Sequence, residues 1–237
     1  MKVSKLSSIV ALGAMLAMPV AARAGNVSGS VSFQGEAPKR TVIKMDADPK
    51  CAAIHGDKKV GSEDAIVSKE GKVANVFVYL KDGVKGKFPT PTAPAEIDQN
   101  GCMYIPHVQG VMVDQPFNIK SSDPTLHNIH CLGKVNPEFN FGQPQPGVKD
   151  KVFHKAEAPI KFKCDVHPWM SAYVFVMENP FFAVSGKDGA FAIKDVPDGE
   201  YTLAAWHEKF GEQTAKIKVA GGELKDQNFT FSAAGKK

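Results

Sequence analysis

Short runs of alternating apolar and polar residues recur along the chain, and turn-forming residues separate them. In residues 27–33, VSGSVSF, the valines and the phenylalanine fall on one face of an extended chain and the serines on the other. Strict alternation of this kind indicates a half-buried β-strand. Further strand-like runs stand at residues 73–80, 111–119, 160–164, 172–177, 191–193, 201–206, 215–219 and 229–231. Many short strands of this kind predict an all-β chain built as sandwiches or Greek-key barrels, with a helix expected only within residues 46–55.

The first 24 residues have the features of a secretory signal peptide. Lys2 and Lys5 precede an apolar run over residues 9–22, and the sequence Ala-Arg-Ala that ends at residue 24 fits a cleavage site between small residues. The apolar run is too short and too interrupted to span a bilayer, and no later segment is long and apolar enough. We therefore expect a periplasmic or secreted chain that does not span the membrane and begins at Gly25.

The charge balance argues against a nucleic-acid partner. The chain of 237 residues holds 29 lysines and arginines and 25 aspartates and glutamates. The predicted leader holds three of the basic residues and no acidic one, which leaves the mature chain close to neutral. Binding to nucleic acid needs a clustered excess of positive charge, and we expect no such partner.

The residues with the most distinctive chemistry lie in one short segment, residues 164–170, with the sequence CDVHPWM. Cys164, His167 and Met170 follow one another at three-residue steps, and His127 stands on a different predicted strand. Two imidazoles and a thiolate in a near-trigonal plane, with a distant axial thioether, describe a blue-copper centre. These residue types suit both oxidation states of copper. The pattern therefore predicts one copper ion per chain.

The same segment resembles the ligand loop of the cupredoxins, most closely that of the amicyanin type, which has the same short Cys-x-x-His-x-x-Met spacing. The pair His127-Asn128 is similar to the His-Asn pair that carries the first ligand in that family. The resemblance implies that His127, Cys164, His167 and Met170 bind the metal. It also implies that Asn128 ties the two ligand segments together by hydrogen bonds, which would orient the ligands.

A centre of this kind leads us to expect a one-electron carrier that docks transiently with redox partners, a dehydrogenase or a cytochrome. A copper carrier, store or resistance protein would use the same ligands, and the sequence barely separates the two functions. An enzyme is disfavoured, because copper reductases and oxidases need a second metal held by a His-x-His cluster, which the sequence lacks.

His167 is expected to be the ligand that faces solvent, with Pro168 and Trp169 beside it. Trp169 then has two possible roles, which the sequence leaves open. Either it forms part of a small docking face of the kind that transient partners use, or it packs against the part of the protein that lies outside the predicted copper domain.

The other histidines and Cys131 are interpreted as structural. On a strand, His130 points away from His127, whereas Cys131 points to the same side and is expected to be a buried thiol. His107 and His207 are expected to make structural hydrogen bonds.

The remaining cysteines allow at most one disulfide within the chain if Cys164 binds metal. The pair Cys51–Cys102 is favoured, and the alternative is that all three of Cys51, Cys102 and Cys131 are small buried side chains. An exported chain can keep a disulfide of this kind.

The segments that flank the ligand motifs resemble a second family, the carboxypeptidase-regulatory-like (transthyretin-like) sandwiches. Residues 27–38 and 185–201 carry this resemblance. It implies that residues 25–95 together with 180–237 form one sandwich, into which a cupredoxin Greek-key domain of residues 96–179 is inserted. The alternative is two consecutive domains, with a long N-terminal arm on the cupredoxin. The accessory sandwich shows no active site and is interpreted as a scaffold or docking module.

Overall fold

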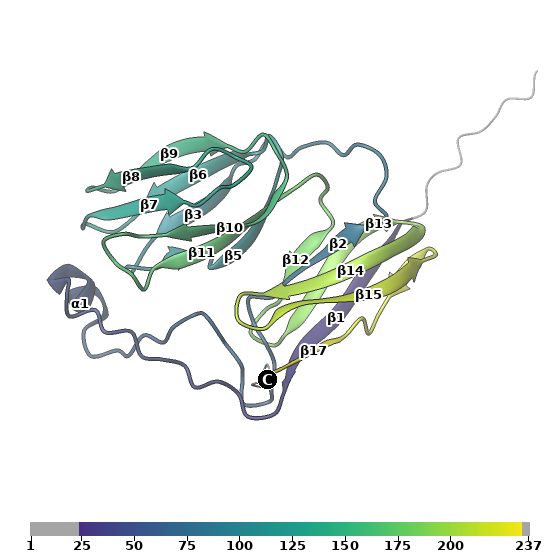
Figure 1. Ribbon diagram of the computed structural model, residues 1–237, viewed down its shortest axis with the longest axis horizontal. Helices are drawn as coiled ribbons and strands as arrows, with labels where there is room; N and C mark the ends of the chain where they lie inside the picture. Colours follow the sequence, from purple (N-terminus) through teal and green to yellow (C-terminus); the bar gives the residue numbers. More distant parts are fainter. Residues whose placement is uncertain (1–23, 234–237) are drawn as a thin grey trace, which may run out of the picture.

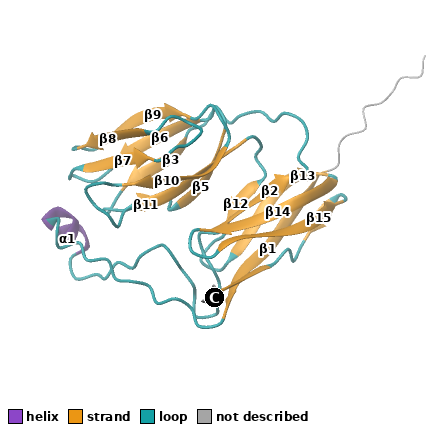
Figure 2. Ribbon diagram, viewed as in Figure 1, coloured by secondary structure: helices purple, strands orange, loops and turns teal. Residues whose placement is uncertain are grey.

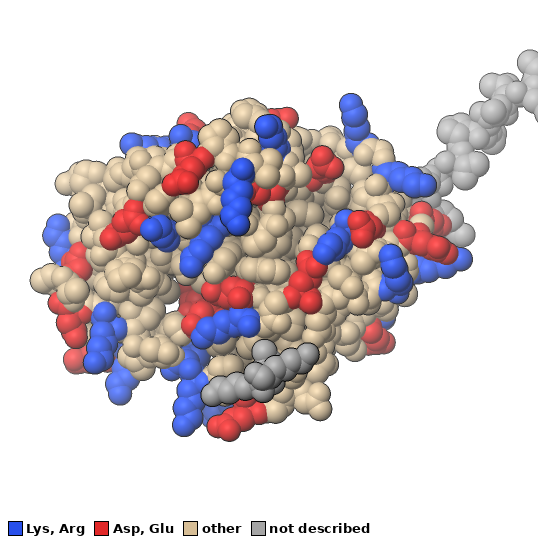
Figure 3. Space-filling model, viewed as in Figure 1, with Lys and Arg blue, Asp and Glu red and all other residues tan. Residues whose placement is uncertain are grey.

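The computed structural model describes residues 24–233, so the predicted signal peptide lies almost wholly outside the described residues (Figure 1). These residues form 17 strands and one short helix, which confirms the predicted all-β class (Figure 2). No helix within residues 24–233 is long and apolar enough to cross a membrane. Basic and acidic side chains are intermixed over the face seen in Figure 3.

The first sandwich is built from the two ends of the chain. Strand β1 pairs antiparallel with β13 and parallel with β16 and β17, and the facing sheet has the order β12-β2-β14-β15. The first sheet comprises β1 (Ala24–Gln34), β13 (Ala190–Pro197), β16 (Gly222–Leu224) and β17 (Phe229–Ser232). The second comprises β2 (Phe77–Asp82), β12 (Phe182–Val184), β14 (Gly199–His207) and β15 (Gly211–Val219).

The core of this sandwich follows from the alternation seen in the sequence. Val27, Val31 and Phe33 of β1 point inward and are buried, whereas the serines between them are partly exposed. They pack with Leu80 and Leu203 from the facing sheet in one apolar cluster. Burial of one face of each sheet therefore fixes the register of the strands.

The second sandwich is built from the middle of the chain. One sheet has the order β5-β11-β10-β7-β8 and the other β4-β3-β6-β9. The first of these comprises β5 (Val108–Met112), β7 (His127–Cys131), β8 (Phe139–Gln143), β10 (Glu157–Lys163) and β11 (Ser171–Met177). The other comprises β3 (Ala95–Gln99), β4 (Tyr104–Ile105), β6 (Pro116–Ser121) and β9 (Gly147–Val152).

The chain leaves the first sandwich after β2 and returns to it at β12. The outward connection, residues 83–94, contains the Pro-rich stretch that sequence reasoning took for a connector. This strand order agrees with an insertion. The exact domain boundaries and the transthyretin-like relationship of the first sandwich stay predictions.

A long arm, residues 35–72, runs between β1 and β2 and reaches the second sandwich (Figure 1). It carries α1 (Pro49–His55), which lies within the one segment predicted to be helical. Asp48 caps this helix by accepting hydrogen bonds from the backbone N–H groups of Lys50 and Cys51. Cys51 forms a disulfide with Cys102 of the second sandwich, as the sequence favoured.

The two sandwiches contact each other through buried and partly buried aromatic side chains. Phe77 of β2 stacks on Phe175 of β11 with ring centroids 3.9 Å apart, and Trp206 of β14 meets the same Phe175 ring at 5.1 Å. Beside them, His107 pairs with the carboxylate of Glu208 across the two units. This contact joins the sandwiches through both apolar packing and a buried ion pair.

Candidate metal centre

The loop between β10 and β11 presents three of the predicted ligands. Cys164 follows β10 directly, and its backbone N–H donates to the carbonyl of Met170 at 3.2 Å. The Met170 N–H donates to the carbonyl of His167, and the His167 N–H donates to Sγ of Cys164 at 3.3 Å. These bonds close the loop on itself and hold the side chains of Cys164, His167 and Met170 toward the interior. Met170 is fully buried in the core cluster that contains Cys164.

His127 reaches the same place from the neighbouring strand β7, which pairs antiparallel with β10. The predicted role of Asn128 in tying the two segments is confirmed. Its Oδ1 accepts hydrogen bonds from the Asp165 N–H at 2.6 Å and from Sγ of Cys164 at 3.2 Å. The ligand loop is thereby fixed against β7.

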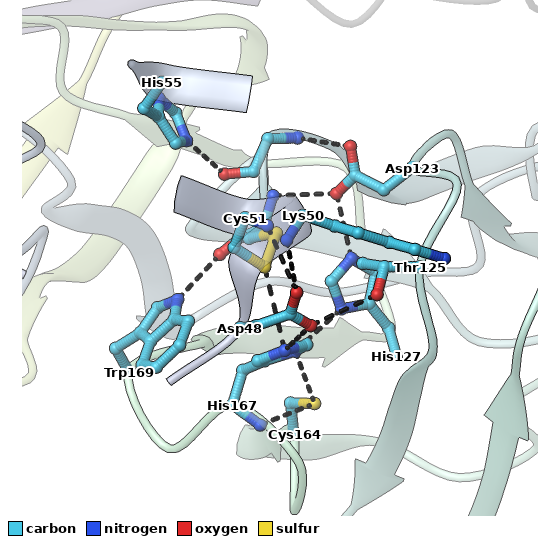
Figure 4. The surroundings of a disulfide bond; sticks show 12 residues. Asp48, Lys50, Cys51, His55, Asp123, Thr125, His127, Cys164, His167 and Trp169 are labelled. Carbon is cyan, nitrogen blue, oxygen red and sulfur yellow. Dashed lines mark hydrogen bonds and ion pairs between the residues drawn. A yellow bond between two sulfur atoms is a disulfide. The ribbon is translucent and has the colours of Figure 1, made fainter. Parts of the chain in front are cut away.

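Three donor atoms converge at the centre of this arrangement (Figure 4). Nδ1 of His127 lies 2.9 Å from Nδ1 of His167, and Sγ of Cys164 lies 3.8 Å from the latter. One donor atom from each of the three side chains lies within 4.8 Å of the others. The side chains of His127, Cys164 and His167 are all buried.

The outer ring nitrogen, Nε2, of both His127 and His167 is hydrogen-bonded to a carboxylate. Nε2 of His127 donates to Asp123 at 2.9 Å, and Nε2 of His167 donates to Asp48 at 2.9 Å. A carboxylate can only accept, so the proton of a neutral ring sits on Nε2, and Nδ1 presents a lone pair. The two Nδ1 atoms share a hydrogen bond when one ring carries a second proton, and both can turn their lone pairs to a metal ion when that proton is absent. The donor set therefore fits a soft or borderline metal ion.

The two carboxylates are themselves fixed by hydrogen bonds. Asp123 also accepts from the backbone N–H groups of Gly101 and Cys102 at 2.8 and 2.7 Å. Asp48 accepts from the Thr125 hydroxyl as well as capping α1. Burial works against the charge on Asp48, but the bond from His167 and the cap bonds outweigh it and lower the pKa of Asp48 to about 2. Both groups remain ionised partners of the imidazoles.

The surroundings of His127 and Cys164 favour the charged form of each side chain. Burial opposes a proton on His127, but the Asp123 carboxylate and the Cys164 sulfur raise the pKa of His127 to about 9. Burial likewise opposes a thiolate at Cys164, yet hydrogen bonds from His127 and from backbone N–H groups bring the pKa of Cys164 below its ordinary value. A thiolate is the form that binds metal.

Sequence reasoning missed Asp48 and Asp123. Asp123 stands four residues before His127, and this closeness was a usable signal. Asp48 stands 119 residues before His167, on an arm whose path the sequence does not reveal. Carboxylates that accept from ligand histidines orient the rings and raise their basicity.

The expectation that His167 faces solvent is wrong. The side chain is 2% exposed because α1 and the disulfide lie over it, with Sγ of Cys51 at 3.7 Å from its Nε2. The helix α1 is fastened at both of its ends as well. The ammonium of Lys50 donates to the carbonyl of Pro124, and the ring of His55 bonds the carbonyl of Gly101.

Trp169 packs beside the predicted ligand His167, with ring centroids 5.0 Å apart. Its Nε1 donates to the carbonyl of Cys102 at 3.0 Å, so it is also tied to the disulfide. Trp169 also lines a surface cavity of about 560 Å³ that extends toward His107 and Glu208 between the two sandwiches. One side of the Trp169 ring therefore lines the cavity, whereas the side chain of His167 is buried.

The remaining histidines and Cys131 stay away from the centre. His130 bonds Asp165 and Glu138 on the outer face of β7, and Cys131 is a buried free thiol, both as expected from strand parity. His107 is buried in its pair with Glu208, and His207 is buried against the ring of Phe210.

Comparisons with known proteins give partial matches. No family model matches the sequence, and no curated protein matches it. A purple cupredoxin from Nitrosopumilus maritimus is 22% identical, with 35% of this chain and 99% of that chain covered and a TM-score of 0.30. A copper-containing nitrite reductase from Thermus scotoductus is 18% identical over 43% of this chain and 25% of its own, at a TM-score of 0.34. A reduced amicyanin variant is 17% identical over 42% of this chain and 98% of its own, at 0.33. TM-scores this low say nothing about the function of this chain.

Proposed function

We propose that this chain is an exported copper protein that holds one copper ion and passes single electrons between redox partners. The proposed ligands are His127, Cys164, His167 and Met170. The partners would be a dehydrogenase or a cytochrome that docks transiently in the periplasm or outside the cell. One observation carries the proposal, namely that Nδ1 of His127, Nδ1 of His167 and Sγ of Cys164 meet in a buried space although they come from two segments.

The residues around this space would keep the proposed ligands in place in both oxidation states of a bound copper ion. Asn128 holds the Cys164 loop against β7, while Asp123 and Asp48 hold the two rings by their outer nitrogens. Copper, when bound, would supply a centre that alternates between its two oxidation states. Rigid ligands reduce the rearrangement that accompanies such a change. The buried position also excludes water from the ligands.

The test is a visible spectrum and a metal analysis of copper-loaded protein. We expect one copper per chain and an intense visible band in the oxidised form, because a thiolate ligand to copper produces such a band. Cys164→Ser should abolish the band, whereas Cys131→Ser, which changes the other buried free thiol, should keep it. A colourless, redox-silent oxidised protein would contradict the proposal.

A second function, copper carriage or resistance without electron transfer, is favoured by one observation. The whole ligand set is buried, and the arm with α1 covers His167, the ligand that would otherwise offer an edge to a partner. Rapid, reversible reduction of the loaded protein by a cytochrome would support the electron carrier. Slow reduction, together with transfer of Cu(I) to a chelator, would support the carrier of copper.

A further inference from the structure

The two ligand histidines have sulfur on both sides. Their Nδ1 atoms face Cys164, and their outer sides face the disulfide, with Sγ of Cys51 at 3.7 Å from Nε2 of His167 (Figure 4). Asp48, Cys51 and His167 form one group whose donor atoms lie within 4.8 Å of one another. Cys102, Asp123 and His127 form a second such group. The disulfide joins these two groups.

We propose that Cys51 and Cys102, when their disulfide is reduced, form a second Cu(I) site through which copper reaches the inner ligands. Two thiolates are the soft ligands that Cu(I) prefers. Nε2 of His167 lies 3.7 Å from Sγ of Cys51, where its N–H can donate to a thiolate, and Asp48 and Asp123 place negative charge beside a cation. The passage of copper inward rests on the proposed function, but binding at the two thiols does not.

The inner ligands are buried under the arm, and this burial is the reason why copper would need a second site on its way to them. None of the four proposed inner ligands is more than 3% exposed, and Cys51 and Cys102 are fully buried as well, so both a reductant and copper reach this region only when the arm moves. The cover is the arm, and the disulfide is its covalent attachment to the second sandwich. Reduction would release that attachment and present two thiols directly outside His127 and His167. The same event would therefore open the path and provide a ligand pair along it.

The chemistry balances with an external dithiol as the reductant. The bond between Sγ of Cys51 and Sγ of Cys102 breaks and two thiols form, while the donor dithiol loses two electrons and two protons and becomes a disulfide. One Cu(I) ion then binds both sulfurs, and the two thiol protons leave to solvent. Copper keeps its oxidation state throughout.

The experiment counts Cu(I) bound by the metal-free full-length mature chain in competition with a chromogenic chelator. The chain is prepared with its disulfide intact, or reduced with a phosphine that is removed before titration without oxygen. We expect one equivalent for the oxidised chain and two for the reduced chain. With Cys164→Ser the expected values are zero and one. If the proposed site at Cys164 does not exist, the number of Cu(I) ions bound falls by one in both preparations. If the proposed site at Cys51 and Cys102 does not exist, the oxidised and reduced preparations bind the same number.

Two variants identify the sulfurs responsible. Cys51→Ser/Cys102→Ser should bind a single equivalent under both conditions, and Cys131→Ser should still bind two when reduced. Loss of the second equivalent in Cys131→Ser would overturn the proposal.

Folding and the rate of uptake supply the last checks. The near-UV circular dichroism of the reduced chain should match that of the oxidised chain, and a reduced chain that has lost this spectrum would also overturn the proposal, because the site requires a folded dithiol state. Copper uptake by the reduced chain should be at least tenfold faster than by the oxidised chain. Equal rates would contradict the inward path.

Discussion

The carboxylate of Asp48 accepts a hydrogen bond from Nε2 of His167 at 2.9 Å across 119 residues of sequence. The same carboxylate caps α1, so the helix of the arm and the ring of the proposed ligand share one anchor. This relationship makes the arm part of the centre, because the orientation of His167 depends on it. It also makes the effect of changing Asp48 measurable at the metal.

Asp48→Asn should weaken copper binding by about 10–100-fold, the usual effect of removing a carboxylate that orients a ligand histidine. Asparagine retains the helix cap, so the effect is assigned to the ring and not to α1. Competition with a chelator measures it. Asp114→Asn is the matched control, since Asp114 pairs with the exposed His154 far from the ligands, and its affinity should not change.

Phe175→Ala should lower the free energy of unfolding by about 3–5 kcal/mol, measured by urea titration. The ring is 1% exposed and stacks on Phe77, so its loss leaves a cavity where the two sandwiches meet. Val148→Ala, at an exposed position of β9, should change the stability by less than about 0.5 kcal/mol. A small effect of Phe175→Ala would mean that the sandwiches do not depend on this contact.

Glu208→Gln should cost about 3 kcal/mol of unfolding free energy, because it leaves His107 buried without its charged partner. Burial works against a proton on His107, but Glu208 raises the pKa of this histidine above its ordinary value. Adding His107→Gln to Glu208→Gln should recover part of the loss, whereas simple addition of the two effects would refute the pairing. Glu200→Gln, in an exposed pair with Lys218, is the control and should have little effect.

His207 should make the protein less stable as the pH falls from about 6.5 to about 4. Burial lowers the pKa of His207 from 6.5 to about 4, and within residues 24–233 its Nε2 has no hydrogen-bond partner. The unfolded chain therefore takes up a proton before the folded chain does. Over this range the folded state should lose about 3 kcal/mol relative to a chain without the group.

The measurement for His207 is the difference in unfolding free energy between the wild type and His207→Gln at several pH values. That difference should change with pH only between about 4 and 6.5. A constant difference between wild type and His207→Gln would contradict the buried, neutral ring.

Local patterns predicted the parts of the structure that depend on neighbours in sequence. Alternation gave the inward residues of β1, strand parity gave the opposite directions of His130 and Cys131, and the spacing of the ligand loop placed Cys164 beside His167. In each case the geometry of one strand or one tight loop decides the outcome. The pairing of Cys51 with Cys102 was favoured among the three cysteines that remain once Cys164 is assigned to the metal, and the structure confirms it.

The arm is the part that the sequence did not reveal. Its segment has weak periodicity, and its position over His167 depends on contacts made one by one, by Asp48, Lys50 and His55. Such contacts involve residues far apart in the chain and leave no periodic signal. The burial of His167 was missed for that reason, although the residue was correctly brought next to His127 and Cys164.

The pairing of β1 with β13 and β17 has a consequence for how the chain folds as it is made. The first strand leaves the ribosome long before β13 and β17, because the whole second sandwich with its proposed ligands is synthesised in between. Until β13 and then β17 appear, β1 lacks the strands that pair with it in the finished sheet. Pairing of chain ends that are so distant is slow. We expect newly made protein to need protection of its N-terminal strand until synthesis is complete.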